Sequence, residues 1–93
     1  MFLIVAALLG TASNLYAATV TASWNANPEP DIAGYKLSYG TATGVYTTTI
    51  DVGNVTTYVP TGLAPATGYF FVVQAYNTGG LTSAYSTDRK SVV

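Results

Sequence analysis

Few side chains in this sequence could do chemistry. The 93 residues contain no histidine and no cysteine, which removes the Ser–His pairing, thiolate catalysis, disulfides and cysteine-held metals. Among the four acids, Glu29 and Asp31 share one loop, and two carboxylates that flank a substrate can hydrolyse a sugar. No aromatic subsite surrounds that loop. We therefore predict no catalytic residue, with Asp31 capping its own turn, Glu29 solvated, and a hydrolase as the less favoured alternative.

Cofactor and nucleic-acid sites also lack their usual patterns. The acids do not follow the spacing of an EF-hand around a glycine, and no helix is expected after the glycine-containing turns, as a phosphate-binding loop would require. The net charge is -1, without the clustered basic surface of a nucleic-acid-binding protein or a polybasic membrane-binding segment. We expect no metal, no cofactor and no nucleic-acid partner.

The N-terminal segment resembles a secretory signal. Met1–Gly10 is a continuous apolar run of about half the roughly 20 residues needed to cross a bilayer, and small residues stand at a plausible cleavage site after Ala17 or Ala18. We predict a signal peptide over 1–17, a domain over 18–93, no membrane span after removal of the signal, and a secreted, cell-surface or bacterial periplasmic location. No Lys or Arg precedes the run, so a buried strand or helix of the domain is the alternative.

The rest of the chain has the composition and periodicity of an all-β domain. Eight Tyr and nine Gly, with many Val and Thr, favour strands joined by tight turns. Apolar residues alternate in two early segments, which predicts two strands with inward-facing rows and places Lys36 and Ser38 toward water. These rows are Val20, Ala22 and Trp24, then Tyr35, Leu37 and Tyr39.

The segment Leu63–Asn77 is the best-defined part of the sequence. Its start, Leu63-x-Pro65-x-Thr67-x-Tyr69, has the form of a tyrosine corner, in which a phenol bonds to the backbone a few residues upstream. The strand that follows has one face predicted to be core and one predicted to face outward. The core face is Tyr69, Phe71, Val73 and Ala75, and the outward face is Phe70, Val72, Gln74 and Tyr76.

Several motifs in order resemble a fibronectin type III domain, in particular the type found in secreted bacterial proteins. They are Trp24, Pro28-x-Pro30-Asp31-Ile32-Ala33-Gly34-Tyr35, Tyr35-x-Leu37-x-Tyr39-Gly40, Val52-Gly53-Asn54-Val55-Thr56, Leu63-x-Pro65-x-Thr67-x-Tyr69 and Ala75-x-Asn77. The resemblance implies an immunoglobulin-like β-sandwich of two antiparallel sheets with Greek-key connections. The residues expected to be structural are Trp24, Tyr35, Leu37, Leu63, Tyr69, Phe71 and Val73.

The sequence departs from this family at three places, which suggests truncation at both ends. The predicted signal ends almost where the Trp24 strand begins, so the first strand of the family is expected to be missing. Pro60 occupies a core position, which a sheet tolerates mainly on an edge strand. The last strand is expected from Leu81 onward, but the tail loses the apolar alternation at Arg89 and Lys90.

The predicted function is a non-catalytic secreted module that acts as a spacer or protein-interaction domain, as part of or derived from an extracellular or cell-surface protein. An apolar outward row can mark an interaction surface, although neighbouring side chains could also half-cover it. The candidate interaction face is Phe70, Val72, Gln74, Tyr76 and Lys36. The alternative is a small carbohydrate-binding accessory domain of a polysaccharide-degrading system, with an extracellular polysaccharide as partner. It would need coplanar exposed rings at Tyr46, Tyr76 and Tyr85.

Overall fold

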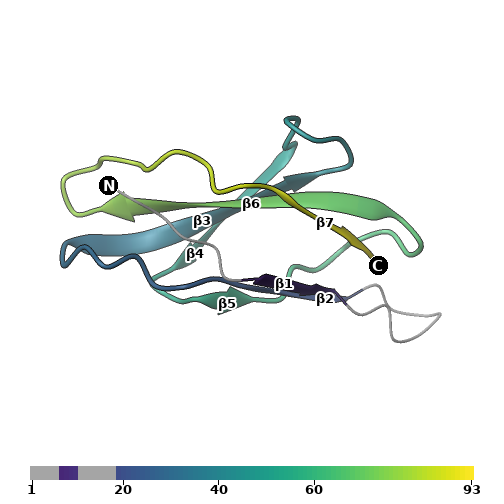
Figure 1. Cartoon of the computed structure of the whole chain (residues 1–93), viewed down its shortest axis with the longest axis horizontal. Coiled ribbons are helices and arrows are strands. Elements are labelled where there is room, and N and C mark those ends of the chain that lie inside the picture. The colour runs from purple at the N-terminus through teal and green to yellow at the C-terminus, as the bar shows by residue number, and fades with distance from the viewer. Residues whose placement is uncertain (1–6, 11–18) are drawn as a thin grey trace.

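A computed structural model describes residues 7–10 and 19–93, and this part of the chain forms strands without helices (Figure 1). The strands are β1 (Ala7–Gly10), β2 (Val20–Ser23), β3 (Ile32–Gly40), β4 (Thr48–Gly53), β5 (Thr57–Tyr58), β6 (Gly68–Asn77) and β7 (Arg89–Val92).

The strands form two sheets stacked face to face, with the order β1-β2-β5 in the small sheet and β4-β3-β6-β7 in the large one (Figure 1). All neighbouring strands are antiparallel. β4 and β5 follow one another in the chain but belong to different sheets, so the turn between them crosses the sandwich. The prediction of an all-β sandwich of two antiparallel sheets is confirmed.

The core lies between the sheets and contains the predicted inward rows. Trp24 is 4% exposed, and its ring centroid lies 5.7 Å from that of Tyr35. Every residue expected to be structural lies in this core or packs against it, as Tyr69 does. The core residues from both sheets are Val20, Ala22, Trp24, Tyr35, Leu37, Tyr39, Leu63, Phe71, Val73, Ala75 and Val93.

The tyrosine corner is formed as predicted. The Tyr69 hydroxyl accepts a hydrogen bond of 2.8 Å from the backbone N–H of Ala64. Ala66 takes a left-handed backbone conformation, with φ of 54°, in the turn that leads into β6. The buried Leu63 side chain sits just before this turn, so the corner fixes where β6 enters the sandwich.

The first strand, which we expected to be missing, is supplied by residues within the predicted signal. Ala7–Gly10 pairs with Ser23–Val20 along the whole of β2. The other residues of 1–17 lie outside the described part of the chain, so the signal peptide and the boundary at residue 18 remain predictions. Within the described residues, the alternative of a strand in the folded domain applies to Ala7–Gly10.

Pro60 lies where its missing N–H costs little. β5 pairs with β2 alone and ends at Tyr58, so it is a short edge strand, the kind of strand that tolerates a proline. Pro60 follows it and is fully buried. Because the proline lies beyond the paired residues, it fills a core position without removing a sheet hydrogen bond.

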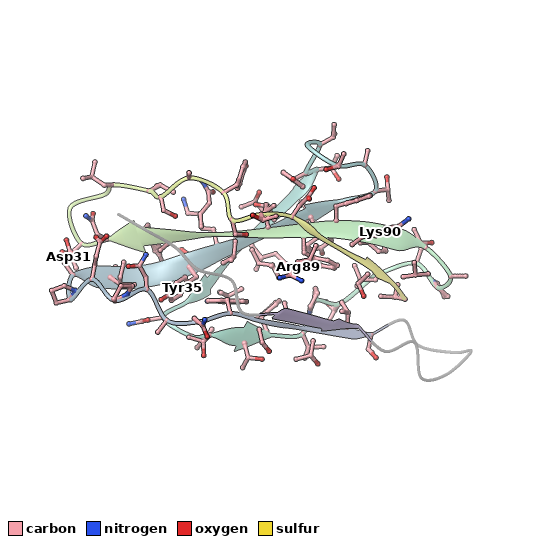
Figure 2. The ribbon with its side chains drawn as sticks, in the orientation of Figure 1. Asp31, Tyr35, Arg89 and Lys90 are labelled. Carbon is pink, nitrogen blue, oxygen red and sulfur yellow. The ribbon has the colours of Figure 1, made fainter. Side chains whose placement is uncertain are left out.

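The last strand differs from the prediction in position and in pattern. It forms at Arg89–Val92 and not from Leu81, and it pairs with the start of β6. Ser91 and Val93 are buried, whereas Arg89 and Lys90 are both exposed. Figure 2 shows Arg89 directed toward the space between the sheets and Lys90 directed away from it. Because β7 is an edge strand, the long Arg89 side chain can reach solvent from the inner side.

Candidate interaction face

The outer face of the large sheet brings together the residues predicted to form an interaction face. β3 and β6 are adjacent, and Lys36 lies opposite Gln74 in their register. Gly34 lies opposite Tyr76, and Gly40 lies opposite Phe70. Phe70 and Tyr76 therefore mark the two ends of one row along β6.

Tyr76 is held by groups from two neighbouring strands. Its hydroxyl donates to the Asp51 carboxylate at 2.7 Å and 3.0 Å, and the Lys36 Nζ lies 5.5 Å from the centroid of its ring. The hydrogen bond to Asp51 raises the pKa of Tyr76. The same bond, supported by the Gly53 N–H and by Lys36, lowers the pKa of Asp51. The pair therefore stays as a neutral phenol and a carboxylate, and Tyr76 is a donor rather than a base.

Gly34 leaves the space in which the Tyr76 ring lies. A Cβ built on Gly34 would be 2.4 Å from the Tyr76 hydroxyl oxygen and 2.6 Å from its Cζ. The ring thus crosses β3 directly over this glycine on its way to Asp51 on β4. The Tyr76 ring therefore requires a glycine at position 34, a reason that the sequence pattern alone did not reveal.

The other end of the row has a similar arrangement. The Lys90 Nζ lies 5.8 Å from the centroid of the Phe70 ring, and Lys90 faces Phe70 in the β6–β7 register. Both rings of the row are partly exposed, and each has a lysine over it. Asp51 and Lys90 also belong to this face, and the sequence pattern does not reveal them because their placement depends on which strands lie beside β3 and β6.

The middle of the outer face is covered by neighbouring side chains, which corrects the expectation that Val72 and Ser38 are exposed. Val72 is 2% exposed, so a partner cannot reach it. Ser38, expected to face water, is fully buried and shares a 2.9 Å hydrogen bond with Thr49. Gln74 donates from Nε2 to the backbone carbonyl of Ser83 at 3.0 Å. β3 and β6 are the central strands, so their outer side chains are covered by those of their neighbours.

The loop that carries Glu29 and Asp31 makes hydrogen bonds that stabilise the fold. Asn27 Oδ1 accepts the N–H of Glu29 at 3.1 Å, so Asn27 caps this turn. The Asp31 carboxylate accepts from Asn77 Nδ2 at 3.2 Å, and its backbone carbonyl accepts from Thr78 N–H at 3.0 Å, at one end of the molecule (Figure 2). No group of three potential metal ligands occurs within residues 7–10 and 19–93.

The tyrosines proposed as sugar platforms do not form a flat surface. The rings of Tyr46 and Tyr85 lie 5.2 Å apart but at 71°, an edge-to-face contact. The Tyr46 hydroxyl donates to Asp88 Oδ2 at 3.1 Å, and Thr43 donates to the same oxygen. Desolvation raises the pKa of Tyr46. Tyr76 belongs to the separate group with Asp51, so the coplanarity that stacking on a sugar requires is absent from the Tyr46–Tyr85 pair.

The fold is an immunoglobulin-like β-sandwich. It is defined by the order of the strands in the two sheets, by a buried tryptophan after β2 and by a tyrosine corner before β6. The fibronectin type III domain family model matches residues 9–91, and the chain belongs to this family.

A sequence relative and a solved structure are similar to this chain. A Kelch domain-containing protein of Saccharolobus solfataricus is 41% identical over 68 residues, which cover 73% of this chain and 9% of that protein. An Fn3-like protein from Clostridium thermocellum has a TM-score of 0.71 and 30% identity, covering 90% of this chain and 82% of its own.

A human structure shares the fold. The sixth fibronectin type III domain of the human fibronectin type III domain containing protein 3 has a TM-score of 0.69 and 24% identity, covering 92% of this chain and 79% of its own. No helix in residues 7–10 and 19–93 is long and apolar enough to cross a membrane.

Proposed function

We propose that this chain is a non-catalytic module of an extracellular or cell-surface protein, and that it contacts a protein partner through the two ends of the outer row on β6. The observation that carries this proposal is the repeated arrangement of a half-exposed aromatic ring under a lysine, at Tyr76 with Lys36 and at Phe70 with Lys90. Membership in the fibronectin type III family, whose domains are generally non-catalytic, supports the absence of catalysis.

The chemistry of the face indicates the chemistry of the partner. Aromatic rings are enriched in protein interfaces because they bury much area with few rotatable bonds. Lys36 and Lys90 add positive charge at both ends of the row, and Asp51 is already hydrogen-bonded to Tyr76. The partner expected here presents apolar side chains next to acidic ones.

A binding measurement tests the face. Proteins captured from culture medium by the chain are identified and purified, and their affinities are measured for the wild type and for Phe70→Ser. We expect Phe70→Ser to weaken binding by about tenfold or more, as loss of an aromatic hot-spot residue does. Leu81→Ser is the control, because Leu81 is 68% exposed and lies outside the row. Equal affinities of the three proteins, with unchanged melting temperatures, would contradict the proposal.

Export from the cell is a second part of the proposal. It is supported by the apolar run Met1–Gly10 and by the small residues that follow it. The measurement is the mass of the chain recovered outside the cytoplasm, which should correspond to cleavage after Ala17 or Ala18. An intact chain retained in the cytoplasm would overturn it.

A further inference from the structure

The large sheet ends on one side at an edge strand that carries little protection against pairing. β4 pairs with β3 and has no other neighbouring strand among the described residues. Its six residues include no proline and no lysine, and Asp51 is its single charge. Natural edge strands are usually very short or carry lysine, proline or a bulge. β4 has one such bulge at its end, at Val52, where the register with β3 shifts between Asp51 and Gly53, and Thr48–Asp51 keep regular pairing with β3.

The other edge of the large sheet and the β5 edge of the small sheet differ in this respect. β5 is two residues long and is followed by the buried Pro60. β7 carries two adjacent cations, Arg89 and Lys90. The edge of β6 beyond β7 is occupied by Ser83 and Ser86, whose backbone and side chains bond to it. β4 is therefore the edge of the large sheet better able to accept another strand.

The side chains of β4 also leave apolar surface to be covered. Ile50 and Val52 pack against the core but are half-exposed, because the inner row of the large sheet stops at this strand. Nearby in the chain, the turn and segment around β5 expose Val55 at 41% and Val59 at 47%. An added strand would continue the inner row over Ile50 and remove its remaining exposed surface from water.

We propose that β4 pairs antiparallel with β4 of a second copy of this chain, centred on Ile50, to join the two large sheets into one. In this register Ile50 faces Ile50 and Thr49 faces Asp51 across the two-fold axis, within the regular part of β4 that precedes its bulge. Residues directly opposite in an antiparallel pair share a face, so the half-buried apolar row and the exposed polar row both continue. The single charge never meets its own copy, and this self-complementarity favours a second copy over an unrelated peptide.

Two substitutions at Thr49 test the register with opposite signs. Thr49→Asp places two acids opposite each other at two symmetric positions and should weaken the dimer about 2- to 30-fold. Thr49→Lys places a lysine opposite Asp51 and should strengthen it by a similar factor, less at high salt. Both variants lose the same hydrogen bond to Ser38, so they are matched. Sedimentation equilibrium over a concentration series gives the dissociation constants, and thermal melting checks folding.

The outcomes separate clearly. The proposal is supported if the wild type associates and the dissociation constant of the dimer is higher for Thr49→Asp and lower for Thr49→Lys. If both variants change the dissociation constant equally, the register is wrong. If the wild type and Thr49→Lys are monomers at every concentration, there is no dimer. Thr21→Asp and Thr21→Lys are the controls, since Thr21 is an exposed residue of the central strand β2 and should leave association unchanged.

A cross-linking experiment tests the same pairing independently. The chain contains no cysteine, so Ile50→Cys introduces a single thiol. Opposite residues in an antiparallel pair have Cα atoms roughly 4.5–5.5 Å apart, which suits a disulfide. With oxidised glutathione as the oxidant, Ile50→Cys should form covalent dimers at micromolar concentration. Val92→Cys, on the opposite edge and 56% exposed, should not. Equal cross-linking of the two variants would overturn the proposal.

Discussion

At the scale of single residues, Tyr76 shows how several neighbours specify one side-chain position. Gly34 leaves room for the ring, Lys36 lies over it, and Asp51 accepts its hydroxyl hydrogen. Gly34 and Lys36 belong to β3 and Asp51 belongs to β4, and the bond to Asp51 spans 25 positions. The outcome is a phenol oriented across β3, rather than one that rotates freely in solvent.

Replacing Tyr76 by Phe should raise the pKa of Asp51 toward its ordinary value, because the phenol is the main group that stabilises the carboxylate. A depressed pKa in the folded state stabilises the fold above the unfolded-state pKa, and this contribution is lost as the pH falls through the folded-state pKa. The variant should therefore lose less stability on acidification than the wild type. NMR titration of the Asp51 carboxyl carbon measures the pKa, and an unchanged value would show that the hydrogen bond is not formed in solution.

At the scale of elements, the segment between β6 and β7 protects the edge of β6 with serine side chains. The backbone N–H of Ala75 donates to Ser83 Oγ at 2.9 Å, and that of Val73 donates to Ser86 Oγ at 2.9 Å. The two serine N–H groups in turn donate to the carbonyls of the same β6 residues. The segment thus pairs with β6 without being a regular strand.

Ser83→Ala should destabilise the fold by about 1–3 kcal/mol, because it leaves the buried N–H of Ala75 without an acceptor. Ser86→Ala should cost less, since Ser86 is only partly buried. Chemical denaturation gives both values, and hydrogen exchange of the Ala75 amide should accelerate in the first variant. Thr87→Ala, exposed in the same segment, is the control. A Ser83→Ala midpoint equal to that of Thr87→Ala would refute the assignment.

Periodicity predicts which way a strand faces, but it does not predict what covers it. The rows through Leu37 and Phe71 were identified because alternate residues share a face, and the tyrosine corner at Tyr69 has a local signature. Ser38 was placed wrongly because its burial depends on lying between β4 and β6. The position of β7 was not predicted because the inner-row residues of this strand, Arg89 and Ser91, are polar. The segment before it bonds to β6 through hydroxyl groups such as that of Ser86, which leave no apolar pattern either.

At the scale of the whole molecule, the role of the N-terminal segment determines how complete the small sheet is. In the described structure β1 covers one edge of β2, and β5 covers only Ala22 and Ser23 on the other. Cleavage after Ala17 would remove β1 and leave β2 with this short partner. Val20 and Ala22, both fully buried here, belong to the strand that would lose support.

A chain of residues 18–93 should consequently have a lower unfolding midpoint than the full chain, because it loses the β1–β2 ladder. Amide exchange should rise most in β2 and remain low in β3 and β6. Differential scanning calorimetry and hydrogen exchange of the two chains make the comparison. If both chains unfolded at the same temperature with equal protection in β2, β1 would contribute nothing to the sandwich in solution.

Asp51 belongs to both surfaces inferred for this molecule. On the outer face it accepts the Tyr76 hydroxyl, and in the proposed dimer it lies opposite Thr49 of the second copy. A ligand on the face that withdraws Tyr76 would free the carboxylate and change its interaction across the edge. Thermodynamic reciprocity then requires that dimerisation alter the affinity for that ligand by the same factor. Measuring partner affinity below and above the dimerisation concentration would give the size of this coupling.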